Sequence, residues 1–231
     1  MKFSFLAAGL VLVASTGAYA NTITFVTPAG ATTSGPVDAS ATFTTGNGVV
    51  DITLTNLEAN PTDVAQLLSD LDFVLSNGAT TGTLASSSGQ EITIASDGTF
   101  TLGSTGSTGW GLNNNVGGGL QLDALGFIGP ENLIIGPAGS GGVYDNANSS
   151  VAGNKPHNPF LDQTATFTVD VAGVTAATTI SSATFSFGTT AGVNVVGVRG
   201  TVPEPGSMLS FLMLGGAGLV FRKRLSGTFQ R

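Results

Sequence analysis

The sequence predicts a mainly β protein, an antiparallel β-sandwich of the jelly-roll or immunoglobulin-like type with one short helix. Three observations favour this fold. Apolar and polar residues alternate over several short stretches, turn-forming dipeptides separate those stretches, and charged residues make up only 9% of the 231-residue chain. The apolar fraction of 41% is too high for a disordered chain. Residues 21–200 are therefore predicted to form one β-sandwich domain.

The first predicted hairpin lies between residues 39 and 55. Val50, Ile52 and Leu54 alternate with polar neighbours, which gives this strand one apolar and one polar face. Asn47-Gly48 precedes the strand and is a turn signal that folds it back on residues 39–44. Thr is frequent on the outward faces, because a β-branched polar residue suits a half-solvated sheet.

A helix is predicted after the turn at residue 60. Asn60 is a good N-cap, Pro61 suits the first helical position, and Asp63 places a carboxylate in the first turn. The apolar residues that follow have the i, i+3, i+4, i+7 spacing of one helical face: Val64, Leu67, Leu68 and Leu71. We expect about two to three turns of helix here, leading into a strand over residues 72–75.

The later part of the chain contains a second hairpin and two further strands. The strongest hairpin signal places apolar pairs on both sides of Asp97-Gly98: Ile92 and Ile94 before it, Phe100 and Leu102 after it. Residues 164–171 and 183–187 alternate in the same way. The glycine-rich stretches 103–119 and 136–142 are predicted to be long loops, and neither carries a phosphate-binding glycine motif.

Composition excludes several classes of function. The chain has no Cys, which rules out disulfides, Cys metal ligands and Cys nucleophiles. Between residues 21 and 202 there are two basic residues against thirteen acidic ones, a net charge of −11. A body this acidic repels phosphate groups, so nucleic acid is not a partner.

The N-terminus has the three parts of a secretory signal peptide. Lys2 supplies the positive charge, residues 3–13 form the apolar region, and Ala18-Tyr19-Ala20 places small residues at the cleavage site. Residues 1–20 are therefore predicted to be removed by cleavage between Ala20 and Asn21. The alternative, a short buried N-terminal helix, would leave the small-residue ending unexplained.

The C-terminus carries a short apolar run followed by a basic cluster. Residues 208–221 number 14 and as a helix would span about 21 Å, less than the ~30 Å hydrocarbon core of a bilayer. Arg222, Lys223 and Arg224 fix the orientation, because basic clusters stay on the cytoplasmic side. Pro203 and Pro205 hold the segment before this apolar run extended. An extended segment can bind to a protease as a strand. The run is predicted to be a short transmembrane helix that holds the protein in the membrane transiently; a permanent anchor is the alternative.

These C-terminal residues resemble a known sorting signal. Val202-Pro203-Glu204-Pro205, the Leu/Gly-rich run and the basic cluster together resemble the PEP-CTERM signal of Gram-negative bacteria. The resemblance implies processing by an exosortase, a membrane-embedded cysteine protease or transpeptidase. It implies that Pro203, Glu204 and Pro205 are the recognition motif and that the basic cluster is the stop signal. Proteins with this signal accompany exopolysaccharide and biofilm production.

The resemblance also divides the chain. The predicted parts are a signal peptide over 1–20, the β-sandwich over 21–200, the sorting signal over 201–224 and a short cytoplasmic tail over 225–231. The tail departs from the usual pattern, because the basic cluster normally ends such a chain or nearly so.

Few residues in the body point to catalysis. The single His157 lies between two prolines, and we expect a loop residue satisfied by backbone or water, since no G-x-S-x-G motif accompanies it. A zinc site would need further His or Cys. A polysaccharide hydrolase would use paired carboxylates, for which the candidates are Asp70, Asp72, Asp123 and Glu131. Because no partner acid stands at a recognisable spacing, Asp70 and Asp72 are expected on solvated faces. No catalytic residue, metal or cofactor is predicted.

Two binding roles stay open at this point. Asp145, Asn146 and Asn148 supply oxygen ligands that suit Ca²⁺, but their spacing is too loose to specify a site. Trp110 is the only Trp and lies in a predicted polar loop, where an exposed ring would stack on a sugar. The alternative is a Trp that plugs the end of the sandwich.

The function predicted from these features is that of an exported, non-enzymatic surface or extracellular-matrix protein. It passes transiently through the inner membrane, is sorted by an exosortase to the cell surface or matrix, and has exopolysaccharide as a further partner. A secreted polysaccharide hydrolase or carbohydrate-binding module is one alternative. A membrane-anchored periplasmic protein is another.

Overall fold

The computed structural model describes residues 20–145, 147, 150–152 and 157–200. The predicted signal peptide up to residue 19, the sorting segment and the tail lie outside these residues. The described part contains thirteen strands and one 3₁₀ turn: β1 (Asn21–Val26), β2 (Ala39–Thr45), β3 (Val49–Asn56), η1 (Val64–Gln66), β4 (Leu68–Leu75), β5 (Thr83–Ile94), β6 (Phe100–Gly106), β7 (Gly111–Val116), β8 (Gly119–Asp123), β9 (Ile134–Ile135), β10 (Phe160–Asp170), β11 (Ile180–Phe187), β12 (Asn194–Val196) and β13 (Val198–Arg199). The prediction of a mainly β protein is confirmed.

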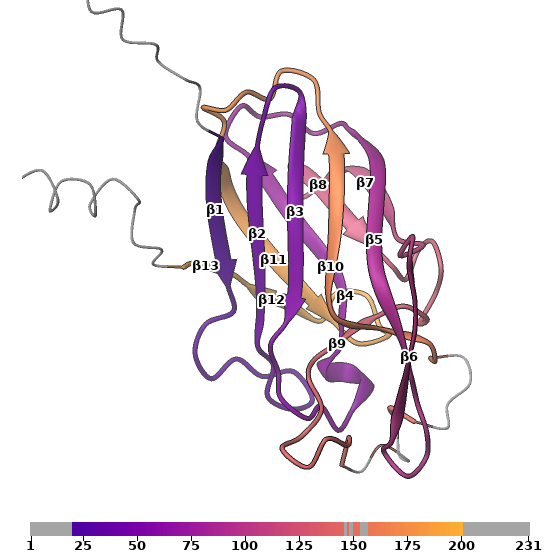
Figure 1. Cartoon of the computed structure of the whole chain (residues 1–231). Coiled ribbons are helices and arrows are strands. Elements are labelled where there is room, and N and C mark those ends of the chain that lie inside the picture. The colour runs from indigo at the N-terminus through magenta and orange to yellow at the C-terminus, as the bar shows by residue number, and fades with distance from the viewer. Residues whose placement is uncertain (1–19, 146, 148–149, 153–156, 201–231) are drawn as a thin grey trace, which may run out of the picture.

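The strands form two facing layers, seen one behind the other in Figure 1. The front layer has the order β13-β1-β2-β3-β10-β5-β6, and the back layer has the order β12-β11-β4-β8-β7. Strand β9 joins them, because it pairs with β10 in the front layer and with β4 in the back layer. The β9–β10 pairing is parallel, so the strands form a mixed network. The prediction of a wholly antiparallel arrangement is wrong in this respect. The jelly-roll or immunoglobulin-like type stays a prediction.

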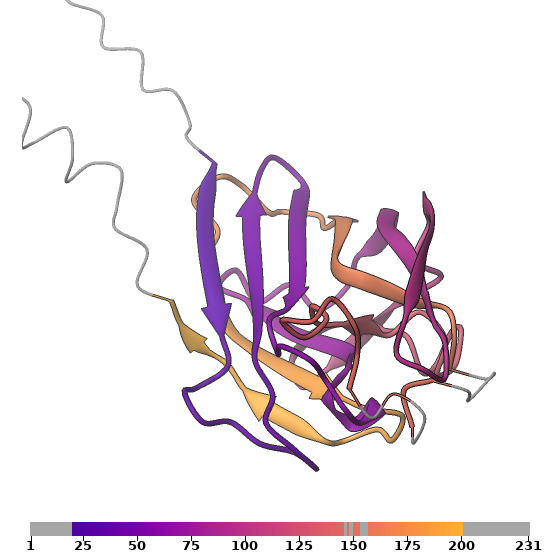
Figure 2. The same ribbon diagram turned by 60° about the horizontal axis from the view of Figure 1, so that its bottom comes forward.

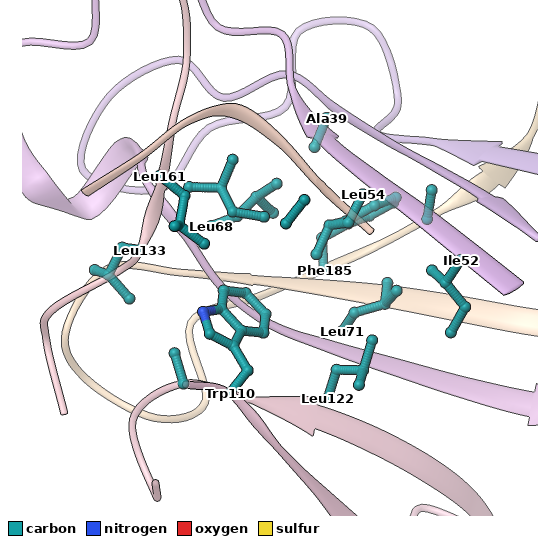
Figure 3. Close-up of a cluster of buried hydrophobic side chains, with 14 of the residues drawn as sticks. Ala39, Ile52, Leu54, Leu68, Leu71, Trp110, Leu122, Leu133, Leu161 and Phe185 are labelled. Carbon is teal, nitrogen blue, oxygen red and sulfur yellow. The ribbon is translucent and has the colours of Figure 1, made fainter. Parts of the chain in front are cut away.

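Apolar and polar side chains alternate along the strands, and the apolar ones fill the space between the layers. Phe43, Ile52 and Phe167 point inward from the front layer, and Phe73 and Phe185 from the back layer, all of them buried. The rings of Phe43 and Phe73 lie 5.5 Å apart and connect the two layers. Figure 3 shows part of this core, with Leu54, Leu71 and Leu122 close together. Each such side chain contributes about 1.5–3 kcal/mol by leaving water.

Both predicted hairpins are present. Strands β2 and β3 pair from Thr45↔Val50 to Ala39↔Asn56 around the Asn47-Gly48 turn. Strands β5 and β6 pair Ile94 with Phe100 and Ile92 with Leu102 around Asp97-Gly98. Gly98 has φ 83, a conformation that favours glycine in tight turns.

The predicted helix after residue 60 is wrong. Only Val64–Gln66 is helical, as a single 3₁₀ turn whose N-cap is Asp63, and Asn60 has φ 55. The Asp63 carboxylate accepts a 2.9 Å hydrogen bond from the amide of Ala65. Residues 68–75 continue as strand β4, which is paired on both sides. The hydrogen bonds of these strand pairings and the burial of the side chains stabilise a strand here more than a helix. A helix of two turns is only marginally stable on its own.

A bulge in β4 explains the misleading apolar spacing. Asp70 pairs with Ser186 but Leu68 pairs with Phe187, so β4 has one more residue here than β11. The extra residue, Ser69, reverses the alternation, and Leu68 and Leu71 both become buried. An i, i+3 apolar pair therefore arises within a strand.

The predicted loop over residues 103–119 is also wrong. This stretch contains the end of β6, all of β7 and the first residue of β8. Gly117 and Gly118, with φ 55 and 81, form the turn that returns β7 onto β8. The apolar residues of β8 bury this hairpin against the core. The second glycine-rich stretch, 136–142, contains no strand or helix in the structure, as predicted.

The side chain of Asn56 closes one end of the two layers. It is fully buried, and its amide nitrogen donates 2.9 Å hydrogen bonds to the carbonyls of Gln66 and Ile134. Its oxygen accepts a 3.1 Å hydrogen bond from the amide of Glu58. One side chain thus connects β3, η1 and β9.

We predict that Asn56→Ala lowers the free energy of unfolding by about 2–4 kcal/mol, because two buried carbonyls lose their donor. Chemical denaturation of the domain measures the change. Thr81→Ala, at an exposed loop position, is the control and should change stability by no more than about 0.5 kcal/mol. Equal effects of the two substitutions would contradict a special role for Asn56.

Candidate functional site

The structure places Trp110 in the core, so the prediction of an exposed ring for sugar stacking is wrong. Its side chain is 4% exposed, and its ring lies 5.4 Å from that of Phe167. The indole Nε1 donates a 2.8 Å hydrogen bond to the carbonyl of Asn132. Figure 3 shows the ring between the layers, beside Leu133. A buried hydrogen-bond partner for the indole N–H makes this position favourable for Trp. Of the two predictions for Trp110, the one of a buried ring at the end of the sandwich is closer to the structure.

Three of the four candidate carboxylates come together on the outward face of the back layer. Asp70 and Asp72 lie on β4, and Asp123 lies on β8. Asp70 is directly opposite Asp123, and Asp72 is directly opposite Gln121. Side chains opposite each other on neighbouring strands have Cβ atoms about 4.5–5.5 Å apart. Glu131 lies between β8 and β9 and does not belong to these pairs.

Asp70 and Asp123 are enclosed rather than solvated, whereas Asp72 is half-buried. Asp70 is 3% exposed and Asp123 9% exposed, which corrects the expectation of a solvated face for Asp70. The side-chain nitrogen of Asn113 on β7 donates to Asp123 Oδ2 at 2.8 Å and to Gln121 Oε1 at 3.0 Å. The amide of Gly126 donates to Asp123 Oδ1 at 2.9 Å. The neighbourhood of Asp123 is therefore built by β7 and by the turn after β8.

The ring of Phe127 covers this end of the site. Gly111 pairs with Asp123, and a Cβ on Gly111 would lie 2.3 Å from the Phe127 ring. The missing side chain of Gly111 is thus what lets the ring lie beside Asp123. Phe127 itself is 54% exposed, so its ring covers Gly111 and also meets solvent.

Burial makes these groups unusually weak acids. Desolvation, then a hydrogen bond and the negative charge from Asp123, raises the pKa of Asp70 to about 8. Desolvation also raises the pKa of Asp72, although a hydrogen bond from Gln121 opposes this. One oxygen of Asp70 and one of Asp72 are buried without a hydrogen-bond partner in the described part of the chain. At neutral pH Asp70 is thus mainly protonated beside Asp123.

The protonated carboxyl of Asp70 can donate a proton, and Asp123 lies directly opposite it. A carboxyl group with a raised pKa is one element of acid–base catalysis. Within the described residues, no group of three His, Cys, Asp or Glu side chains is placed to hold a metal ion. Sequence reasoning named Asp70 and Asp123 as candidates but did not pair them, because they are far apart along the chain.

The remaining predicted residues form no common site with this pair. His157 is half-buried, with Nδ1 3.4 Å from the carbonyl of Ser150. The Asp145 carboxylate accepts a hydrogen bond from the Asn60 side chain at 3.0 Å. Asn146 and Asn148 lie outside the described residues, as do Pro203, Glu204 and Pro205 and the cluster Arg222, Lys223 and Arg224. Among the described residues, no helix has the length and apolar character to cross a membrane.

Comparison with known families identifies the C-terminal segment. Residues 201–224 match the family model of the PEP-CTERM protein-sorting motif. The chain thus carries the signal of an exported protein that an exosortase recognises and sorts at the membrane, and the resemblance seen in the sequence is confirmed. No curated protein and no solved structure matches the chain.

We predict that the stability of the domain falls as pH rises from about 4 to 8, the interval between the ordinary Asp value of 3.8 and the raised pKa of Asp70. In this interval the folded state binds more protons than the unfolded state, so the slope reaches at most ~1.4 kcal/mol per pH unit. Asp70→Asn should flatten this dependence and raise the melting temperature at pH 7. Thermal unfolding across pH measures both effects.

Asp51→Asn, an exposed carboxylate on the front layer, is the control for this experiment and should retain the slope. A slope that is the same in Asp70→Asn as in the unchanged protein would show that Asp70 is not the group that titrates.

Proposed function

We propose that this chain is an exported, non-enzymatic structural or adhesive protein, sorted by an exosortase to the cell surface or extracellular matrix of a Gram-negative bacterium. The observation that carries the proposal is the sorting motif, which begins directly after the folded domain. Exopolysaccharide is the natural partner in that setting, and the protein is associated with biofilm.

The two ends of the domain support processing at both termini. Strand β1 begins at Asn21, the residue after the predicted cleavage site, and pairs with the last strand, β13. The amide of Gly200 donates a 2.8 Å hydrogen bond to the carbonyl of Thr24. Figures 1 and 2 show β1 and β13 side by side at one edge of the domain. The folded part thus extends to within three residues of Pro203.

The enclosure of the carboxylate pair supports a non-enzymatic role. A glycoside hydrolase needs both carboxyls to reach a sugar ring and, in the inverting case, a water molecule between them. Asp70 is almost fully buried, and Phe127 and Asn113 pack around Asp123. The raised pKa of Asp70 nevertheless favours a hydrolase as the second candidate.

We predict that the exported chain loses its basic cluster in cells that contain an exosortase. Mass spectrometry of the C-terminus should find no Arg222–Arg231 peptide, whereas replacing Pro203, Glu204 and Pro205 by Ala should leave that peptide attached. The control is Pro130→Ala with Glu131→Ala, the same dipeptide inside the folded domain, which should be processed normally. An intact C-terminus in the unchanged protein would instead identify a permanently anchored protein.

We predict no turnover of polysaccharide by the purified protein. Release of reducing ends from a panel of neutral and acidic glycans should equal that of a blank, for the unchanged chain and for Asp123→Asn alike. Turnover that disappears in both Asp70→Asn and Asp123→Asn would assign the pair as a hydrolase site and overturn the non-enzymatic proposal.

A further inference from the structure

The outward face of the front layer carries an unusually uniform set of side chains. The register of β1, β2, β3, β10 and β5 arranges them in three rows that run across the strands. We call these rows the threonine face: Thr24, Thr42, Thr53, Thr166 and Ser88 in the first row, Thr22, Thr44, Asp51, Thr168 and Ser86 in the second, and the apolar Val26 with Ser40, Thr55 and Thr164 in the third. In Figure 1 these five strands lie side by side in the layer nearest the viewer.

The hydroxyl groups of the threonine face are held in place by one another. Thr24 and Thr42 are hydrogen-bonded at 2.9 Å, and Thr55 and Thr164 at 3.1 Å. Each such pair uses one of its two O–H donors and leaves the second donor and several lone pairs free. Because Thr has a restricted side-chain torsion, the positions of these hydroxyl oxygens are set before any ligand arrives, while each O–H rotates to meet its partner. Binding to them therefore loses little side-chain entropy.

The charges on and around this face restrict the partner. The threonine face contains no Lys, Arg or His, and its one charged residue is the exposed Asp51, whose carboxylate accepts a 2.8 Å hydrogen bond from Thr168. Arg199 is the only Lys or Arg within the described part of the chain. An anionic polymer would thus meet repulsion without compensation. The face also lacks the aromatic residues that anchor protein interfaces.

A neutral polysaccharide fits these properties. Its hydroxyls donate and accept hydrogen bonds as those of Thr do, and its C–H groups pack on the Thr methyl groups. Neighbouring strands are ~4.8 Å apart, close to the length of one sugar ring in an extended chain. We propose that the threonine face binds a neutral, extended polysaccharide that runs across the strands with about one sugar per strand. This inference rests on the proposed function, because it names the matrix polymer that the exported protein contacts.

The test removes hydroxyls from the middle of the first row. Thr42→Val, Thr53→Val and Thr166→Val together keep the shape and the strand preference of each residue but delete three hydroxyls. The matched control replaces three exposed threonines of the β5–β6 hairpin outside the rows: Thr93, Thr101 and Thr105. Affinity gel electrophoresis of the exported chain is run in soluble cellulose derivatives and amylose as neutral probes and in alginate as the anionic probe. Thermal unfolding verifies that both variants are folded.

We expect the unchanged chain to be retarded by a neutral probe and not by alginate. The row variant should bind at least about tenfold more weakly, and the hairpin variant should bind as the unchanged chain does. Equal binding by the row variant, retardation by alginate alone, or no retardation by any neutral probe would overturn the inference. So would light scattering that finds a dimer which the row substitutions dissociate, because the face would then bind a second copy.

Failure of this inference is distinguishable from failure of the proposed function. The C-terminus of the same preparations is analysed by mass spectrometry. A chain that is processed normally but binds no neutral glycan overturns only the role of the threonine face. A chain that binds but keeps Arg222–Arg231 overturns only the sorting.

Discussion

The hydrogen bonds of the Asn56 amide are the constraint on which the rest of the structure depends. At the ends of the two layers, backbone carbonyls that are buried away from water need hydrogen-bond donors. Asn56 supplies them to η1 and to β9, and β9 pairs with both layers. Because β9 also fixes Leu68 opposite Ile134, the register of β4 follows from this end of the molecule. A substitution of Asn56 would thus disturb strand pairing in both layers.

The bulge at Ser69 determines which side chains of β4 face outward. Without the extra residue, Leu68 and Asp70 would share a face, because side chains alternate strictly along a strand. With it, Leu68 enters the core while Asp70 and Asp72 face outward toward Asp123 and Gln121. The same bulge gives the apolar residues the spacing of a helix. One local irregularity therefore explains both the wrong prediction of a helix and the existence of the carboxylate pair.

The sequence predicts what is local and misses what depends on pairing between distant segments. Alternation and turn dipeptides predict β2, β3, β10, β11 and the β5–β6 hairpin, because each needs only its own residues to define a face. Strand β7 was missed since Gly and Asn disfavour strands, and only its pairing with β8 stabilises it. The sequence left Trp110 open between an exposed loop and the core for the same reason, because its partner carbonyl on Asn132 comes from another loop. The sorting motif is short and contiguous, so sequence alone was sufficient for it.

The distribution of charge connects the fold to its destination. Four of the seven basic residues follow residue 221, whereas the body has a net charge of −11. A cationic body would be held by anionic lipid surfaces, and this one is repelled by them. Strand β1 begins at Asn21 and pairs with β13, so the two ends of the described domain lie together, one beside the predicted cleavage site and the other just before the sorting motif. Removal of the terminal segments, as proposed, would leave an acidic domain that anionic lipid surfaces repel.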